Sequence, residues 1–174
     1  QDGATLSLER IFASDEFASE RFGPVRWLVD GSGYTTLEAS ATVRGFDIVR
    51  YDPATGRRDV LVAAERLVPT GAEAPLILHD YAWSDDGSKL LIFTNTERVW
   101  RTNTRGDYWI FDLGARQLRR VGGRARASSL MFAKFSPDGT RVAYVRDNDL
   151  YMEDLRNDTV TRLTFDGSRK LSNG

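Results

Sequence analysis

One pattern occurs twice in nearly the same form, and this repeat constrains the fold more than any other feature of the sequence. The stretches YAWSDDGSKLLIFT (81–94) and AKFSPDGTRVAYVR (133–146) both read aromatic, Ser, one residue, Asp, Gly, two polar residues and an apolar run. Asp-Gly and Pro-Asp-Gly favour tight turns, because Gly adopts positive φ and Pro fixes φ at little steric cost. The β-branched and aromatic residues that follow suit a half-buried strand. Each stretch therefore predicts a tight turn that leads into a β-strand.

The turn recurs with a regular period. Asp-Gly pairs occur at residues 30–31, 86–87 and 138–139, separated by 56 and 52 residues. A second element follows each pair and reads Asp, four mainly apolar or aromatic residues, Asp, a polar turn and a further strand; it begins at Asp47, Asp107 and Asp149. Each unit thus encodes about four short strands. A period near 50 residues with four strands per unit indicates β-propeller blades, since helical repeats are shorter and have a 3.6-residue apolar period.

We therefore predict an all-β fold, a partial β-propeller of about three four-stranded antiparallel blades, with a short N-terminal helix within residues 5–20. Residues 1–24 form a lead-in segment and residues 25–174 the blades, and residues 62–80 cross from the first blade to the second. Propellers have four to eight blades, and three stacked units leave open faces and unpaired strand edges. We therefore expect the sequence to be the N-terminal part of a larger propeller.

Composition excludes several classes of partner. The 174 residues suffice for one ordinary domain, and 24 Lys and Arg against 25 Asp and Glu give a net charge of −1, with no bulk attraction to nucleic acid or to an anionic membrane. No apolar run approaches the roughly 20 residues that span a bilayer, so we expect no membrane span in this segment. The absence of cysteine excludes disulfides and thiolate chemistry but is compatible with any redox compartment.

No pattern in the sequence marks a catalytic centre. A Gly-x-Ser-x-Gly elbow is absent, and His79, the single histidine, has no identifiable serine partner, so it is interpreted as structural or solvent-facing. The stretch GSGYTT (31–36) lacks the third glycine of a dinucleotide loop and the lysine of a P-loop. The carboxylates of RDNDLYMED (146–154) lack the Gly and Glu of an EF-hand and are interpreted as strand-turn residues. We predict no metal, no cofactor and no catalytic triad in this chain.

One segment departs from the repeating pattern. NTERVWRTNTRGD (95–107) carries Arg98, Arg101 and Arg105, with Trp100 beside the middle arginine. One interpretation is a solvated hairpin whose charges favour solubility. The other is a recognition site, since the planar donors of arginine suit a carbonyl or carboxylate when a neighbouring indole anchors the side chain. The pattern alone leaves both open.

Several stretches, in this order, resemble the N-terminal propeller of the dipeptidyl peptidase IV group of prolyl oligopeptidase-type serine peptidases. They are LSLERIFASDEF (6–17), DYAWSDDGSKLLIFTNTERVWR (80–101), YWIFDLGARQLRRV (108–121), FSPDGTRVAYVRDNDLYMEDL (135–155) and RLTFDGSRKLSNG (162–174). In that family an eight-bladed propeller caps an α/β-hydrolase domain, and the enzyme removes N-terminal dipeptides with Pro or Ala in second position. The resemblance implies that Arg101 binds the substrate backbone and that Trp100 supports it. The family's paired glutamates, which hold the free α-amine, and its catalytic triad are expected beyond residue 174.

The resemblance implies a substrate-gating and substrate-binding portion of a serine exopeptidase, a hydrolase of the aminopeptidase type. Expected partners are a peptide with a free N-terminus, the remaining blades and the α/β-hydrolase domain; a homodimer of the parent is compatible with this reading, as is a periplasmic or secreted location. The alternative is a noncatalytic TolB-like propeller used for protein–protein binding. A Glu-Glu pair in the next blade and a Gly-x-Ser-x-Gly elbow further downstream in the parent reading frame would distinguish the two.

Overall fold

The structure, a computed structural model, describes residues 6–14, 16–17, 23–99 and 101–173. It is mostly β, with antiparallel pairing throughout the two sheets. The smaller sheet has the order β1 (Arg26–Trp27), β2 (Tyr34–Ala39), β3 (Phe46–Tyr51) and β4 (Arg58–Val62). The larger sheet contains β5 (Leu78–Trp83), β6 (Lys89–Val99), β7 (Thr102–Asp112), β8 (Gln117–Arg120), β9 (Leu130–Phe135), β10 (Arg141–Arg146), β11 (Asp149–Asp154) and β12 (Thr159–Arg162).

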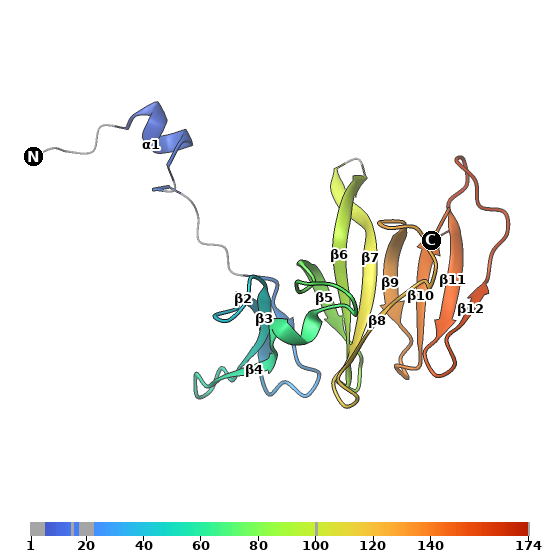
Figure 1. The fold of residues 1–174 in the computed structure, drawn as a ribbon, viewed down its shortest axis with the longest axis horizontal. Coiled ribbons are helices and arrows are strands. Elements are labelled where there is room, and N and C mark those ends of the chain that lie inside the picture. Colours follow the sequence, from blue (N-terminus) through green and yellow to red (C-terminus); the bar gives the residue numbers. More distant parts are fainter. Residues whose placement is uncertain (1–5, 15, 18–22, 100, 174) are drawn as a thin grey trace, which may run out of the picture.

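Each sequence repeat forms four strands, as predicted, but the division into three separate sheets is not observed. The first repeat forms the four-stranded sheet, whereas the second and third repeats share one eight-stranded sheet (Figure 1). The two join where β7 pairs with β9, through Arg105 opposite Met131 and Gly106 opposite Leu130. This contact forms where β6 and β7 extend together past β5 and β8, so that Arg105 and Gly106 reach the first strand of the next repeat.

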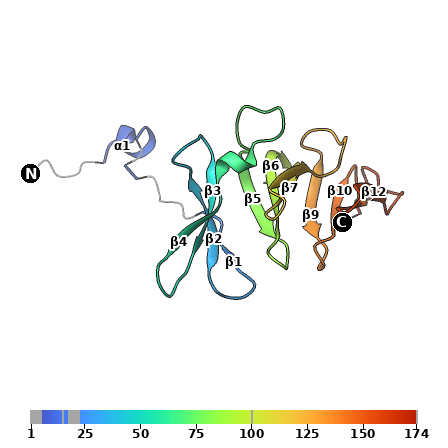
Figure 2. The ribbon, with the colours of Figure 1, turned by 60° about the horizontal axis from the view of Figure 1, so that its bottom comes forward.

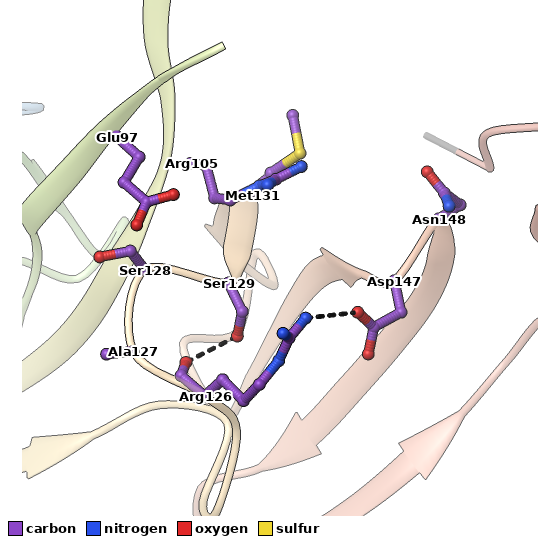
Figure 3. A pocket seen from close by; sticks show the side chains of 9 residues that line it. All are labelled: Glu97, Arg105, Arg126, Ala127, Ser128, Ser129, Met131, Asp147 and Asn148. Atoms are coloured by element: carbon purple, nitrogen blue, oxygen red, sulfur yellow. Dashed lines mark hydrogen bonds and ion pairs between the residues drawn. The ribbon is translucent and has the colours of Figure 1, made fainter. Parts of the chain in front are cut away.

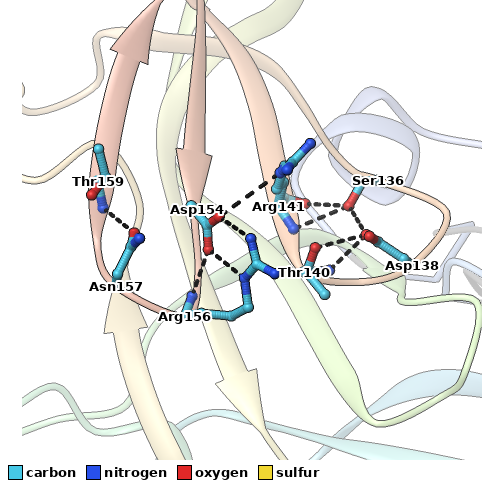
Figure 4. Close-up of polar contacts among 8 residues, drawn as sticks. All are labelled: Ser136, Asp138, Thr140, Arg141, Asp154, Arg156, Asn157 and Thr159. Carbon is cyan, nitrogen blue, oxygen red and sulfur yellow. Dashed lines mark hydrogen bonds and ion pairs between the residues drawn. The ribbon is translucent and has the colours of Figure 1, made fainter.

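The Asp-Gly pairs lie in hairpin turns, as the sequence predicted. The glycines at positions 31, 87 and 139 have φ of 68°, 67° and 62°, a region that glycine enters without steric penalty. The turn between the third and fourth strands of each repeat is also stabilised by an aspartate. Asp52, Asp112 and Asp154 each accept a backbone N–H from two or three residues further on, at 2.8 to 3.0 Å. Figure 4 shows the β9–β10 and β11–β12 turns of the third repeat, which contain the hydrogen bonds of Asp138 and Asp154.

A third set of aspartates closes each repeat. Asp47 and Asp149 stand at or next to the start of the third strand of their repeats, and Asp107 lies in the middle of β7; their exposures are 8%, 1% and 8%, respectively. Each accepts a backbone N–H from the segment that follows the fourth strand, at 2.8 Å from Ala64, 3.0 Å from Ser128 and 3.0 Å from Gly167. We call these three residues the closing aspartates. Their burial is tolerated because each carboxylate is hydrogen-bonded.

The core consists of two clusters that lie between neighbouring repeats. The side chains of β6 alternate between them: Leu90 and Ile92 pack with Ile48 of the first repeat, and Leu91 packs with Val142 of the third. A strand that is apolar on both faces is typical of a sheet covered on both sides. The run KLLIFT contains consecutive apolar residues because the second repeat is packed between the other two.

The connecting segments contain little helix. The N-terminal helix α1 (Leu8–Phe12) is shorter than the predicted segment 5–20, buries none of its residues and begins after Ser7, whose Oγ accepts from the backbone N–H of Arg10 at 3.2 Å. The crossing between the first two repeats is irregular, as predicted, apart from the 3-10 helix η1 (Ala64–Leu67), which the sequence analysis did not predict. Figure 2 shows η1 between β3 and β5. None of the helices in the described ranges is long and apolar enough to cross a membrane.

Candidate functional site

The hairpin of β6 and β7 projects beyond the neighbouring strands (Figure 1). From Lys89 to Thr94 the two strands pair in continuous register, and past Thr94 the register shifts and the pairing resumes with Glu97 opposite Arg105. We call residues 95–106 the arm. The sequence analysis predicted strands only on either side of this segment, so the extension of both strands into the arm is a finding of the structure.

The arm brings together all three arginines that the sequence analysis singled out. Arg101 lies in the turn at the end of the arm, between β6 and β7, and is exposed, as are Arg98 and Arg105. Trp100, the residue predicted to support Arg101, lies outside the described residues. Arg101 is therefore an exposed residue at the end of the arm, in the turn that joins β6 to β7.

A pocket of about 230 Å³ lies at the base of the arm (Figure 3). Three segments meet there: the two strands of the arm, the loop before β9 and the turn between β10 and β11. The pocket is lined by Glu97, Arg105, Arg126, Ala127, Ser128, Ser129, Met131, Asp147 and Asn148. Its charges are balanced, with two arginines and two carboxylates, and one of each forms an ion pair between Arg126 and Asp147 at 3.7 Å. A mixed lining of this kind suits polar groups of either sign.

The comparisons with known proteins identify the family. Residues 84–174, just over half of the chain, match the family described as the dipeptidyl peptidase IV (DPP IV) N-terminal region. The chain belongs to this family. The arm, Arg101 and the whole pocket fall within the matched residues, so the candidate site is part of the DPP IV N-terminal region and not an addition to it.

Individual relatives agree with this assignment. The Probable dipeptidyl-aminopeptidase B of Aspergillus oryzae is 30% identical over 152 residues, which cover 84% of this chain and 15% of the relative. The protein of the same name from Phaeosphaeria nodorum is 25% identical over 99% of this chain and 19% of its own length. The chain thus spans less than a fifth of the length of these curated relatives.

Two solved structures are also similar. The crystal structure of Porphyromonas gingivalis dipeptidyl peptidase 4 matches with a TM-score of 0.77 and 29% identity, over 95% of this chain and 22% of that one. TolB from Acinetobacter baumannii matches with a TM-score of 0.50 and 23% identity, over 84% of this chain and 33% of that one. At that identity the second match shows a likeness of fold alone.

The last described residues of this DPP IV N-terminal region lie beside the pocket. The backbone N–H of Asn173 donates to the carbonyl oxygen of Asn148 at 3.0 Å, and its side-chain Nδ2 donates to Asp166 at 2.9 Å. Asn148 itself lines the pocket. Segment 163–173 therefore returns to the same end of the molecule as the base of the arm.

Of the other residues considered from the sequence, Asp147 and Asn148 line the pocket, and His79 and Asp154 do not. His79 is exposed and its ring meets the edge of Phe93 at a centroid distance of 5.6 Å. Of the carboxylates in residues 146–154, Asp149 and Asp154 bind backbone N–H groups and arginines, which agrees with their interpretation as strand-turn residues. The described ranges contain no group of three or more His, Cys, Asp or Glu side chains that could hold a metal ion.

Sequence reasoning missed most of the pocket. Glu97, Arg126 and Asp147 come from three separate segments, and no local pattern links them. One signal was available: Asp147 and Asn148 both have positive φ, at 51° and 67°, and an Asp-Asn pair between two apolar runs is typical of a two-residue hairpin turn. That turn predicts the end of β10, but not its closeness to the arm.

Proposed function

We propose that this chain is the substrate-gating and substrate-binding part of the propeller of a DPP IV-like serine exopeptidase, one that releases Xaa-Pro and Xaa-Ala dipeptides from peptide N-termini. The observation that carries the proposal is the exposed Arg101 at the end of the arm, in a chain that belongs to this family. In the proposal the three repeats are about three blades of an eight-bladed ring.

Arg101 acts as a ruler in this proposal. An enzyme that removes two residues needs a fixed distance between the peptide N-terminus and its nucleophile. A guanidinium that donates to the peptide backbone near the first residue supplies one end of that distance, and planar donors hold a carbonyl in a defined direction. Trp100 anchors the arginine. Fixing the reactants in this way lowers the entropic part of the barrier.

The remaining parts of the enzyme come from outside this chain. The two glutamates that hold the α-amine belong to the next blade, as membership of the family implies. The nucleophile, its histidine and its acid belong to an α/β-hydrolase domain. The proposed location is periplasmic or secreted, and the proposed ligand is a peptide with a free N-terminus.

The test uses the full-length protein from the parent reading frame and two substrates that differ in one group. The first is a dipeptidyl-proline chromogenic amide with a free α-amine, and the second is the same compound acetylated at that amine. We expect hydrolysis of the first and a loss of at least about 100-fold in kcat/KM for the second, since its charge-assisted bonds to the glutamates are lost. Equal hydrolysis of both substrates, or of neither, would overturn the proposal; the second result would favour the noncatalytic TolB-like alternative.

A further inference from the structure

The arm leaves the sheet at Asn95. This residue has φ of 46°, in the left-handed region that asparagine tolerates better than other side chains with a Cβ. It lies where the register between β6 and β7 shifts, after Thr94 and before Glu97. The backbone at Asn95 therefore sets the direction in which β6 continues toward Arg101.

Both polar groups of Asn95 that face the sheet are bound. Its side-chain Nδ2 donates to Oδ2 of Asp107 at 2.8 Å, and its carbonyl oxygen accepts from Oγ of Ser128 at 2.6 Å. Ser128 is 5% exposed and Asp107 is 8% exposed, whereas Asn95 itself is exposed, so these bonds are partly shielded from water. A partly buried network of this kind restricts motion when each member has its partner.

Asp107 ties this network to the rest of the second repeat. Its Oδ1 accepts from the backbone N–H of Ser128 at 3.0 Å and from the guanidinium of Arg120 at 2.8 Å. Asp47 and Asp149, the other closing aspartates, bind the end of their own repeat in the same way. Among the described residues, Asp107 is the only closing aspartate that also binds the residue at which the preceding strand leaves the sheet. The contact with Asn95 is therefore an addition to the hydrogen bond that all three closing aspartates share.

The opposite strand of the arm is held as closely. A Cβ atom built on Gly106 would lie 2.5 Å from Cε2 of Phe93 and 2.7 Å from the carbonyl oxygen of Thr94, distances that no side chain tolerates. Gly106 also pairs with Leu130 of β9. Because both strands are fixed at the base, the arm has one direction relative to the third repeat.

We propose that Asn95 is a positioning residue for Arg101: through Asp107 and Ser128 it fixes the direction of the arm and thus where the Arg101 guanidinium meets the peptide. This inference rests on the proposed function of Arg101. It assigns Asn95 no contact with substrate. The effect of Asn95 on catalysis is exerted entirely through Arg101. We expect such an effect because catalysis tolerates only small displacements of the groups that bind substrate.

The test is a double-mutant cycle in the full-length enzyme, with Asn95→Ala, Arg101→Ala and the double variant assayed on the dipeptidyl-proline amide. We expect Asn95→Ala alone to lower kcat/KM by about ten-fold, mainly through KM, within the roughly 100-fold that a 1 Å displacement can cost. In the Arg101→Ala background the same substitution should cost less than about two-fold, since residues that act as one unit are not additive.

Two further variants separate positioning from loss of stability. Asp158→Ala imposes the same kind of left-handed strain, at φ of 58°, in the turn between β11 and β12, which lies at the end of β11 away from the pocket. It should leave kcat/KM within about two-fold of the parent. The exchange Asn95→Asp with Asp107→Asn reverses donor and acceptor across the same pair and should recover most of the activity that Asn95→Ala loses.

The outcomes are distinct. An equal fold-loss for Asn95→Ala in both backgrounds, or no loss with Arg101 present, would overturn the positioning inference. If Arg101→Ala itself has full activity, the proposed role of Arg101 fails, and the inference is then judged by amide hydrogen exchange of residues 96–106. Faster exchange in Asn95→Ala than in Asp158→Ala supports a role in holding the arm, and unchanged exchange overturns it.

Discussion

The carboxylate of Glu153 on β11 accepts a hydrogen bond of 2.7 Å from the backbone N–H of Gly122, which follows β8 in the preceding repeat. Glu153 is only 3% exposed, and its other oxygen lies 3.3 Å from the guanidinium of Arg119. One side chain of the third repeat thus binds two groups of the second. This contact, the β7–β9 pairing and the ion pairs of Arg126 with Asp147 and of Arg119 with Asp158 all link the two repeats.

Removing that link should destabilise the chain. In Glu153→Ala the Gly122 N–H loses its partner, whereas Arg119 keeps its ion pair with Asp158, so we expect a loss of roughly 1–3 kcal/mol in the free energy of unfolding. Glu153→Gln retains an acceptor for Gly122 and should cost about 1 kcal/mol. Urea denaturation measures both, with Glu73→Ala, at an exposed loop position, as the control. A Glu153→Ala midpoint equal to that of Glu73→Ala would contradict the prediction.

The three arginines of the arm should differ in their effect on catalysis. In the full-length enzyme, Arg101→Ala should lower kcat/KM on a dipeptidyl-proline substrate by about ten- to 150-fold, the equivalent of the roughly 1.5–3 kcal/mol of a charge-assisted hydrogen bond. Arg98→Ala and Arg105→Ala should lose much less. A similar loss in all three variants would indicate a general charge effect. Equal activity in the parent and all three variants would favour the interpretation of Arg101 as a solvated hairpin residue.

The Asp-Gly turns should make stability depend on acid. Hydrogen bonds from Ser84 and Ser88 lower the pKa of Asp86 from 3.8 to about 2, and those from Ser136 and Thr140 lower the pKa of Asp138 to about 2. Because the folded pKa values lie below the ordinary value, this stabilisation is complete above about pH 4 and is lost as the pH falls toward 2. Melting temperatures between pH 6 and 2 should fall faster for the parent than for Asp86→Asn with Asp138→Asn, and parallel curves would contradict the prediction.

The strand β12 should make the isolated chain associate. All four of its residues are exposed, and Leu163 and Phe165 beyond it are 49% and 74% exposed. An exposed edge strand beside apolar side chains is a template for pairing with another chain. We expect sedimentation to show oligomers that Val160→Lys reduces and that Thr42→Lys, a control on the turn between β2 and β3, does not. A compact monomer that binds no hydrophobic dye would count against the interpretation as part of a larger propeller.

The turns and the number of strands could be predicted from sequence because their causes are local. An Asp-Gly pair such as Asp86-Gly87 specifies its backbone within a few residues, and the repetition of the pattern along the chain gives the number of repeats. The merging of two repeats into one sheet could not be predicted in this way. It depends on Arg105 and Gly106 meeting β9, a contact between strands separated by a turn, β8 and a long loop.

The candidate site also contains residues that local sequence predicts and residues that it does not. Arg101 was found because the arm interrupts a repeating pattern, and the family resemblance gave that interruption a meaning. Asn95 and Ser128 were not found, since an asparagine at positive φ and a serine 33 residues away show no relationship until the chain is folded. Positions that supply chemistry are visible in a sequence more readily than positions that hold them in place.

The closing aspartates bear on how such a protein can be made. Each binds a backbone N–H only 17, 21 or 18 residues further along the chain. A repeat can therefore close as soon as those residues have been synthesised. Contacts of such short range form early and quickly. A nascent chain of this design can close one repeat while the next is still being translated, whereas the packing between neighbouring repeats has to wait until the next repeat has been made.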